Sequence, residues 1–202
     1  ILVFVAICSF ANAQSKKNLN ELVDPQNSKW NMVSGWVSQA RTKVTVLPKI
    51  SSRADSVILQ TQISTDNVLG AVIYNTGGIL IDDGWMRILG SGCPAMERSI
   101  SQWNKGKGKI NSSESPNFVL VADDAIGGLY AINTGGIDEF YLNRIYYYGP
   151  NSLKWECMGM NYDQFIVYCM TKDVRDFYSD FKWTGWENDI KQLGTDQVYS
   201  SY

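Results

Sequence analysis

The middle of the chain contains the stretch LGAVIYNTGGILIDDGWMRILGSG, residues 69–92. Its apolar segments 69–74 and 79–81 flank the sequence NTGG at 75–78, and glycine readily adopts the positive φ angles that tight turns need. This order predicts a β-hairpin. The sequence DDG at 82–84 then predicts a second turn, which is followed by a predicted strand over residues 85–89.

The pattern of short apolar segments separated by turn residues continues on both sides of this stretch. An apolar, β-branched stretch at 56–63 leads through a polar turn into the hairpin. Further strands are predicted at 43–48, 118–122, 129–132, 144–148 and 153–158. The sequence NTGGI occurs twice, at 75–79 and 133–137. Because the flanking residues do not continue the match, repeated turn chemistry explains it better than gene duplication.

Helical spacing of apolar residues occurs near both ends of the chain. Trp30, Val33 and Val37 recur at the three- and four-residue spacing of one helix face, and Ser28 stands where a helix cap is expected. Further helices are predicted at 97–103, 162–170, 173–178 and 183–193. Strands in the middle and helices at both ends predict an α+β fold. We expect a single domain over residues 14–202, with a twisted, mainly antiparallel sheet.

Composition excludes several classes of function. The chain has 202 residues, of which 45% are hydrophobic, and its formal net charge is −2. Such a charge offers no basic surface for nucleic acid. The sequence contains no histidine, which excludes Ser-His-Asp and Cys-His nucleophile pairs and all histidine-bound metals. No calcium-binding loop of the EF-hand type is present either, so we expect no metal and no cofactor.

The first residues resemble an export signal. Residues 1–13 read ILVFVAICSFANA, an apolar run followed by small residues in the A-x-A order of a cleavage site. Cleavage near Ala13 would leave a periplasmic or secreted protein, and no apolar run approaches the roughly 20 residues that span a bilayer. Cys93, Cys157 and Cys169 would remain. Cys157 and Cys169 could form a disulfide in an oxidising compartment, or they could stay free thiols.

Four stretches resemble a bacterial family catalogued as domain of unknown function 2625. They are residues 69–92, VLVADDAIGGLYAIN at 119–133, IYYYGPNSLKWE at 145–156 and FYSDFKWTGWENDI at 177–190. Cys93 precedes Pro94 here, where that family often has histidine. The DDAIGG turn followed by YYYGPNSLKWE is also similar, more loosely, to the SUKH superfamily of Smi/Knr-like regulators and toxin-immunity proteins. That resemblance implies a twisted sheet flanked by helices that acts by binding another protein.

Two pairs of adjacent acidic residues are the first candidates for a functional site. They are Asp82-Asp83 and Asp123-Asp124, each followed within three residues by glycine, where aspartate commonly forms turns. Without an imidazole we expect these carboxylates to shape the backbone rather than to transfer protons. No residue is therefore assigned a catalytic role.

The chain is rich in tyrosine and tryptophan, which often anchor protein partners. We predict a binding surface for another protein, either a toxin or a component of the cell envelope. It would comprise Asp82, Asp83, Trp85, Asp123, Asp124 and the outward-facing members of the 146–148 tyrosine run, Tyr147 among them. The alternative is a carboxylate-dependent hydrolase or a glycan-binding protein of the envelope. That alternative requires two carboxylates converging in one pocket about 5–10 Å apart.

Overall fold

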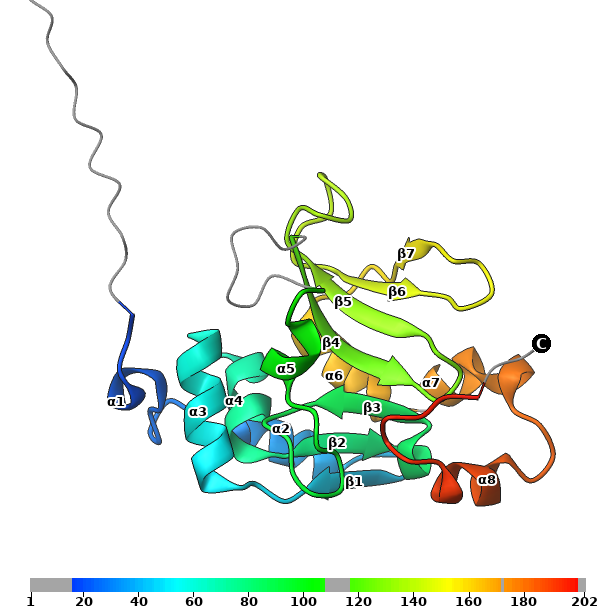
Figure 1. Ribbon diagram of the computed structural model, residues 1–202, viewed down its shortest axis with the longest axis horizontal. Helices are drawn as coiled ribbons and strands as arrows, with labels where there is room; N and C mark the ends of the chain where they lie inside the picture. The colour runs from blue at the N-terminus through cyan, green and yellow to red at the C-terminus, as the bar shows by residue number, and fades with distance from the viewer. Residues whose placement is uncertain (1–15, 108–116, 172, 200–202) are drawn as a thin grey trace, which may run out of the picture.

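The chain folds around one seven-stranded sheet whose strands follow each other in chain order (Figure 1). The computed structural model describes residues 16–107, 117–171 and 173–199. Every neighbouring pair of strands is antiparallel. The strands are β1 Val44–Leu47, β2 Gly78–Ile81, β3 Met86–Leu89, β4 Phe118–Asp124, β5 Leu129–Asn133, β6 Ile145–Tyr148 and β7 Trp155–Cys157.

The helices lie mainly at the two ends of this sheet. In Figure 1, α1, α3 and α4 lie on one side and α7 and α8 on the other, while α2 and α6 lie behind the strands. The α-helices are α1 Leu19–Leu22, α2 Trp30–Ser38, α3 Ser51–Thr61, α4 Val68–Asn75, α5 Ile100–Asn104, α6 Tyr162–Cys169, α7 Asp173–Phe177 and α8 Trp186–Gln192. Two short 3₁₀ helices are η1 Asp82–Gly84 and η2 Ser179–Phe181. The α+β prediction is confirmed.

The predicted hairpin at residues 69–81 is wrong, because its first arm is helix α4. The side chain of Asn67 caps this helix by accepting a hydrogen bond from the Leu69 N–H at 2.8 Å. Val68–Ile73 are all buried, so the helix has no polar face from which its 3.6-residue period could be recognised. Gly70 lets α4 approach the preceding chain, since a Cβ there would lie 2.1 Å from the Ser64 carbonyl oxygen.

Strand β2 pairs instead with β1 and β3, which place Val46 and Ile88 on either side of Ile79. The apolar, β-branched stretch 56–63, which was expected to lead into the hairpin, belongs mostly to helix α3. This helix packs against α4. The other predicted strands and helices are present with shifted ends. Ser28 lies outside α2, although its hydroxyl oxygen accepts a hydrogen bond from the Trp30 N–H at 3.3 Å.

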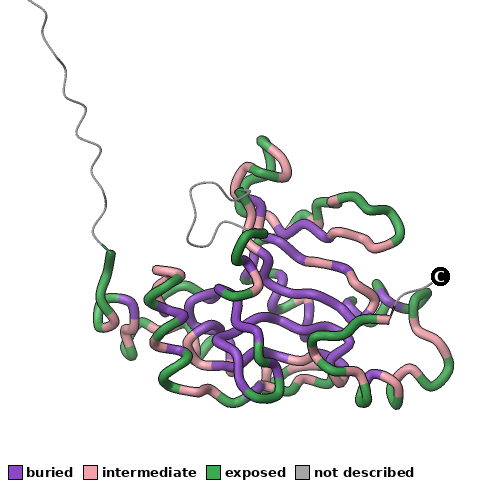
Figure 2. Tube along the Cα trace, in the orientation of Figure 1, coloured by how far each residue is buried: buried purple, intermediate pink, exposed green. Residues whose placement is uncertain are grey.

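The core lies between the central strands and the helices that cover them, as the buried segments of Figure 2 show. Cys169 is buried in α6, whereas Cys157 is exposed on β7, and both thiols are free. The two cysteines therefore do not form a disulfide in this structure. Among the residues that the structure describes, no helix is long and apolar enough to cross a bilayer. The proposed signal, residues 1–13, lies outside the described residues.

Candidate functional site

The first acidic pair lies in η1, between strands β2 and β3. Both residues adopt positive φ angles, 48° for Asp82 and 61° for Asp83. Asp82 is buried and accepts hydrogen bonds from Arg175 at 2.7 Å and from Lys182 at 3.2 Å. Burial alone would raise the pKa of Asp82, but the hydrogen bond from Arg175 and the charge of Lys182 hold it below its ordinary value. This carboxylate thus ties the sheet to the C-terminal segment.

Asp83 points to a different partner. Its carboxylate forms an ion pair with the Lys43 ammonium group at 2.5 Å. Asp82 and Asp83 line one cavity of about 400 Å³ together with Lys43, Arg175, Lys182, Trp186 and Glu187. The lining therefore carries three basic and three acidic side chains, whose formal charges cancel.

The carboxylate of Asp123 is held by two buried arginines. It accepts hydrogen bonds from Arg87 Nε at 2.6 Å and from Arg98 Nη2 at 2.7 Å. Arg87 and Asp123 are directly paired across β3 and β4. Arg87 also donates to the Gln197 carbonyl at 2.7 Å, and Arg98 donates to the Asp196 carboxylate. These two contacts hold Asp196 and Gln197, near the C-terminus, against the two arginines.

The Asp124 carboxylate has no basic partner among the described residues, although Arg87 donates to the Asp124 main-chain oxygen at 2.6 Å. The carboxylate accepts hydrogen bonds from the hydroxyls of Tyr178 at 2.8 Å and Tyr147 at 2.9 Å, and from the Gly128 N–H at 2.7 Å. The Tyr178 hydroxyl also bonds to that of Tyr130. Burial raises the pKa of Asp124 above its ordinary value, against the opposing effect of these hydrogen bonds. The residue closes the turn between β4 and β5.

The prediction of an outward-facing surface must be corrected, because Asp83 alone of its six residues is more than marginally exposed. Trp85 is 1% exposed and packs against three aromatic rings at 5.3–5.7 Å. Tyr147 points inward to Asp124. Asp82 and Asp83 line one cavity in the described part of the chain, and Asp123 and Asp124 line another of about 220 Å³. In the described residues, no three His, Cys, Asp or Glu side chains converge to hold a metal ion.

An exposed apolar feature that was not predicted from the sequence lies between β5 and β6. The loop of residues 134–144, between β5 and β6, projects from the ends of these two strands at the top of Figure 1. At its tip Phe140, Tyr141 and Leu142 are 88%, 58% and 49% exposed. We call residues 134–144 the Phe140 loop. Its signal in the sequence is the run EFYL between the turn residues GGID and NR.

Hydrogen bonds of two side chains fix the conformation of the Phe140 loop. The buried Asn133 side chain accepts from the Gly135 N–H at 2.9 Å and donates to the Asp138 carbonyl at 2.6 Å. The Asp138 carboxylate accepts from the backbone N–H groups of Phe140 at 2.7 Å and Tyr141 at 3.2 Å. These hydrogen bonds connect the backbone on both sides of the apolar tip.

These features define an α+β meander domain whose acidic turns are occupied by internal contacts. The chain belongs to the family described as "Protein of unknown function DUF2625", whose model matches residues 19–202. An uncharacterized protein of Haemophilus influenzae is 39% identical over 183 residues, covering 91% of this chain and 80% of the relative. The uncharacterized protein YbfG of Escherichia coli is 30% identical over 191 residues, covering 92% and 84%. No solved structure matches the chain significantly.

Proposed function

We propose that this chain is a non-enzymatic protein-binding domain that works in the periplasm or after secretion. The observation that carries the proposal is the exposed apolar tip of the Phe140 loop, whose backbone is hydrogen-bonded to the side chains of Asn133 and Asp138. Contiguous exposed apolar residues on a soluble domain commonly mark an interaction site. Aromatic anchors dominate the energy of protein interfaces, and an anchor that is already ordered loses little entropy on binding.

The charges around the tip favour a partner of a particular kind. Glu139, which precedes Phe140, is exposed, while the Asp138 carboxylate is occupied by the backbone of the loop. An apolar pocket with a basic rim would accept Phe140 and pair with Glu139. A toxin or an envelope protein with such a pocket fits the looser SUKH resemblance, in which the domain acts by binding a protein. The apolar run and A-x-A order of residues 1–13 support export.

Site-specific crosslinking tests this function. A photoreactive phenylalanine analogue at position 140 should crosslink one defined protein in native envelope fractions, whereas the same group at Leu59, 39% exposed on α3, should not. The purified partner should then bind Phe140→Ser at least about 30-fold more weakly than wild type. Leu59→Ser is the matched control and should bind normally. Partner binding that is indifferent to Phe140→Ser would refute the proposal.

Export is tested separately from binding. A tagged full chain should fractionate with the periplasm or the medium in a form shortened by about 13 residues, as expected for signal cleavage. Replacing Ala11 and Ala13 by bulky residues should block that shortening, because cleavage requires small side chains there. A full-length chain that remains in the cytoplasmic fraction would contradict this part of the proposal.

The hydrolase alternative has less support from the geometry. Glycoside cleavage needs one carboxylate that donates a proton and a second that attacks or activates water. Asp82 and Asp123 are engaged by basic side chains, and Asp124 is enclosed by tyrosine hydroxyls. Glycan cleavage by purified protein that Asp124→Asn abolishes would nevertheless favour a hydrolase over a binding domain.

A further inference from the structure

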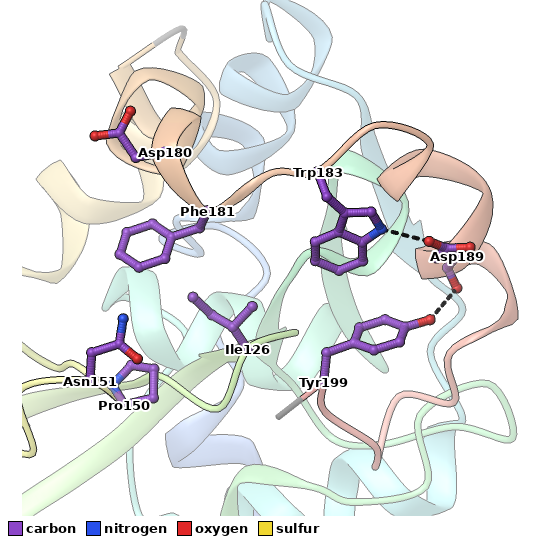
Figure 3. A pocket seen from close by; sticks show the side chains of 8 residues that line it. All are labelled: Ile126, Pro150, Asn151, Asp180, Phe181, Trp183, Asp189 and Tyr199. Carbon is purple, nitrogen blue, oxygen red and sulfur yellow. Dashed lines mark hydrogen bonds between the residues drawn. The ribbon is translucent and has the colours of Figure 1, made fainter. Parts of the chain in front are cut away.

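A cavity of about 500 Å³ lies at the C-terminal side of the domain, and none of the four paired aspartates lines it. Figure 3 shows the eight side chains that line it, which come from three separate parts of the chain. The turn between β4 and β5 supplies one, the turn between β6 and β7 supplies two, and the segment 180–199 supplies the rest. They are Ile126, Pro150, Asn151, Asp180, Phe181, Trp183, Asp189 and Tyr199. A volume of this size is typical of small-molecule sites.

We propose that this cavity binds an organic quaternary ammonium ion. Three aromatic rings, those of Phe181, Trp183 and Tyr199, form its wall, and such rings attract cations to their faces. The lining includes two acidic side chains, Asp180 and Asp189, and no basic one. An anion would therefore be repelled, whereas a cation with an apolar shell is complementary in both charge and surface.

The hydrogen bonds behind the rings strengthen this preference. Trp183 Nε1–H donates to the Asp189 carboxylate at 2.6 Å, and the Tyr199 hydroxyl donates to the Asp189 main-chain oxygen at 3.1 Å. Donation to a carboxylate pushes electron density into the indole ring, which makes its face more attractive to a cation. Trp85 supports the indole at a centroid distance of 5.7 Å. The aromatic wall is thus ordered before a ligand enters.

The position of the free acceptors selects the kind of cation. A primary ammonium ion has three N–H donors to satisfy. The polar edges of Trp183 and Tyr199 already face Asp189, whereas Asn151 and Asp180 lie on the opposite side of the lining (Figure 3), so an ammonium ion over those two rings would lack acceptors for its N–H groups. A quaternary ammonium ion has no N–H group and can be held by ring faces and net negative charge alone. It therefore fits this cavity better than a primary amine does.

Three small probes test the proposal on the purified full chain. Choline is the cation, 3,3-dimethylbutan-1-ol is its neutral carbon analogue, and ethanolamine is the primary amine. Tryptophan fluorescence and calorimetry should show choline binding about tenfold more tightly than either of the other two, the factor expected for a partly desolvated cation–π contact. Equal binding of the neutral analogue, tighter binding of ethanolamine, or no choline binding at millimolar concentration would each overturn the assignment.

Variants locate the binding to this cavity. Phe181→Leu keeps an apolar side chain but removes a ring, and it should weaken choline binding several-fold. Phe177→Leu is the matched control, because Phe177 is equally exposed, 37% against 38%, but does not line the cavity. Asp180→Asn should weaken binding of choline and leave that of the neutral analogue unchanged. Unchanged choline affinity in folded Phe181→Leu would refute the proposal, which does not depend on the Phe140 loop.

Discussion

The buried ion cluster around Asp123 should respond strongly to loss of its carboxylate. Asp123→Ala would leave Arg87 and Arg98, which are 2% and 8% exposed, without their shared counter-charge. Main-chain carbonyls, such as that of Gln197, would still accept hydrogen bonds from the guanidinium groups, but they carry no net charge. Removing one partner from a buried ion pair typically costs about 3–5 kcal/mol. We expect a loss of this size in the free energy of unfolding.

Urea denaturation followed by tryptophan fluorescence measures this loss as a shift of the midpoint at constant slope. Asp196→Ala is the matched control, because Asp196 binds the same Arg98 but is 57% exposed, and it should cost less than about 1 kcal/mol. Should the alanine variant fail to fold, Asp123→Asn keeps a neutral acceptor and should cost about 1.5–3 kcal/mol. Equal losses at positions 123 and 196 would refute the reasoning from burial.

The remaining predictions concern pH dependence and close packing. The pKa of Asp82 is lowered from 3.8 in the folded state, so its stabilisation is present above that pH and fades as the pH falls. In urea titrations at pH 7 and pH 3, the cost of Asp82→Asn should therefore shrink at pH 3. The pKa of Asp124 is raised, so its contribution to stability fades as the pH rises. The loss of stability in Asp124→Asn should therefore be larger at pH 3 than at pH 7. The same trend for both variants would contradict these assignments. Gly128→Ala should cost about 1–3 kcal/mol, because its Cβ would lie 2.3 Å from Asp124 Oδ2. Gly35→Ala, in the open middle of α2, should gain about 0.5–1 kcal/mol by thermal melting, and a loss there would refute this comparison.

The sheet could be predicted from sequence because most of its strands are short and bounded by turn residues. In a meander the order of the strands in the sheet is their order in the chain. Once the strands are located in the sequence, the topology therefore follows. Helix α4 could not be predicted in the same way. Its buried residues are consecutive, so their hydrophobicity shows no helical period. They are buried on all sides because α2, α3 and α6 pack around the helix, which the local sequence does not show.

The partners of the acidic residues are hidden from local sequence for a different reason. Asp82 is held by Arg175, 93 residues away, and Asp123 by Arg87, 36 residues away. One signal was nevertheless present. Arg87 stands alone within the apolar strand sequence WMRIL, and arginine is almost never fully buried without a partner. A buried counter-charge on the neighbouring strand could therefore have been inferred from that residue.

The repeated sequence NTGGI shows why identical residues need not have identical roles. In the first copy Asn75 ends helix α4, and its side chain donates to the Ala71 carbonyl at 2.9 Å. In the second copy Asn133 ends strand β5, where no helix carbonyl is available, and its buried side chain organises the Phe140 loop. The preceding segment decides which backbone groups the asparagine meets. The same five residues therefore end a buried helix in the first copy, whereas in the second copy they begin the loop that carries the exposed apolar tip.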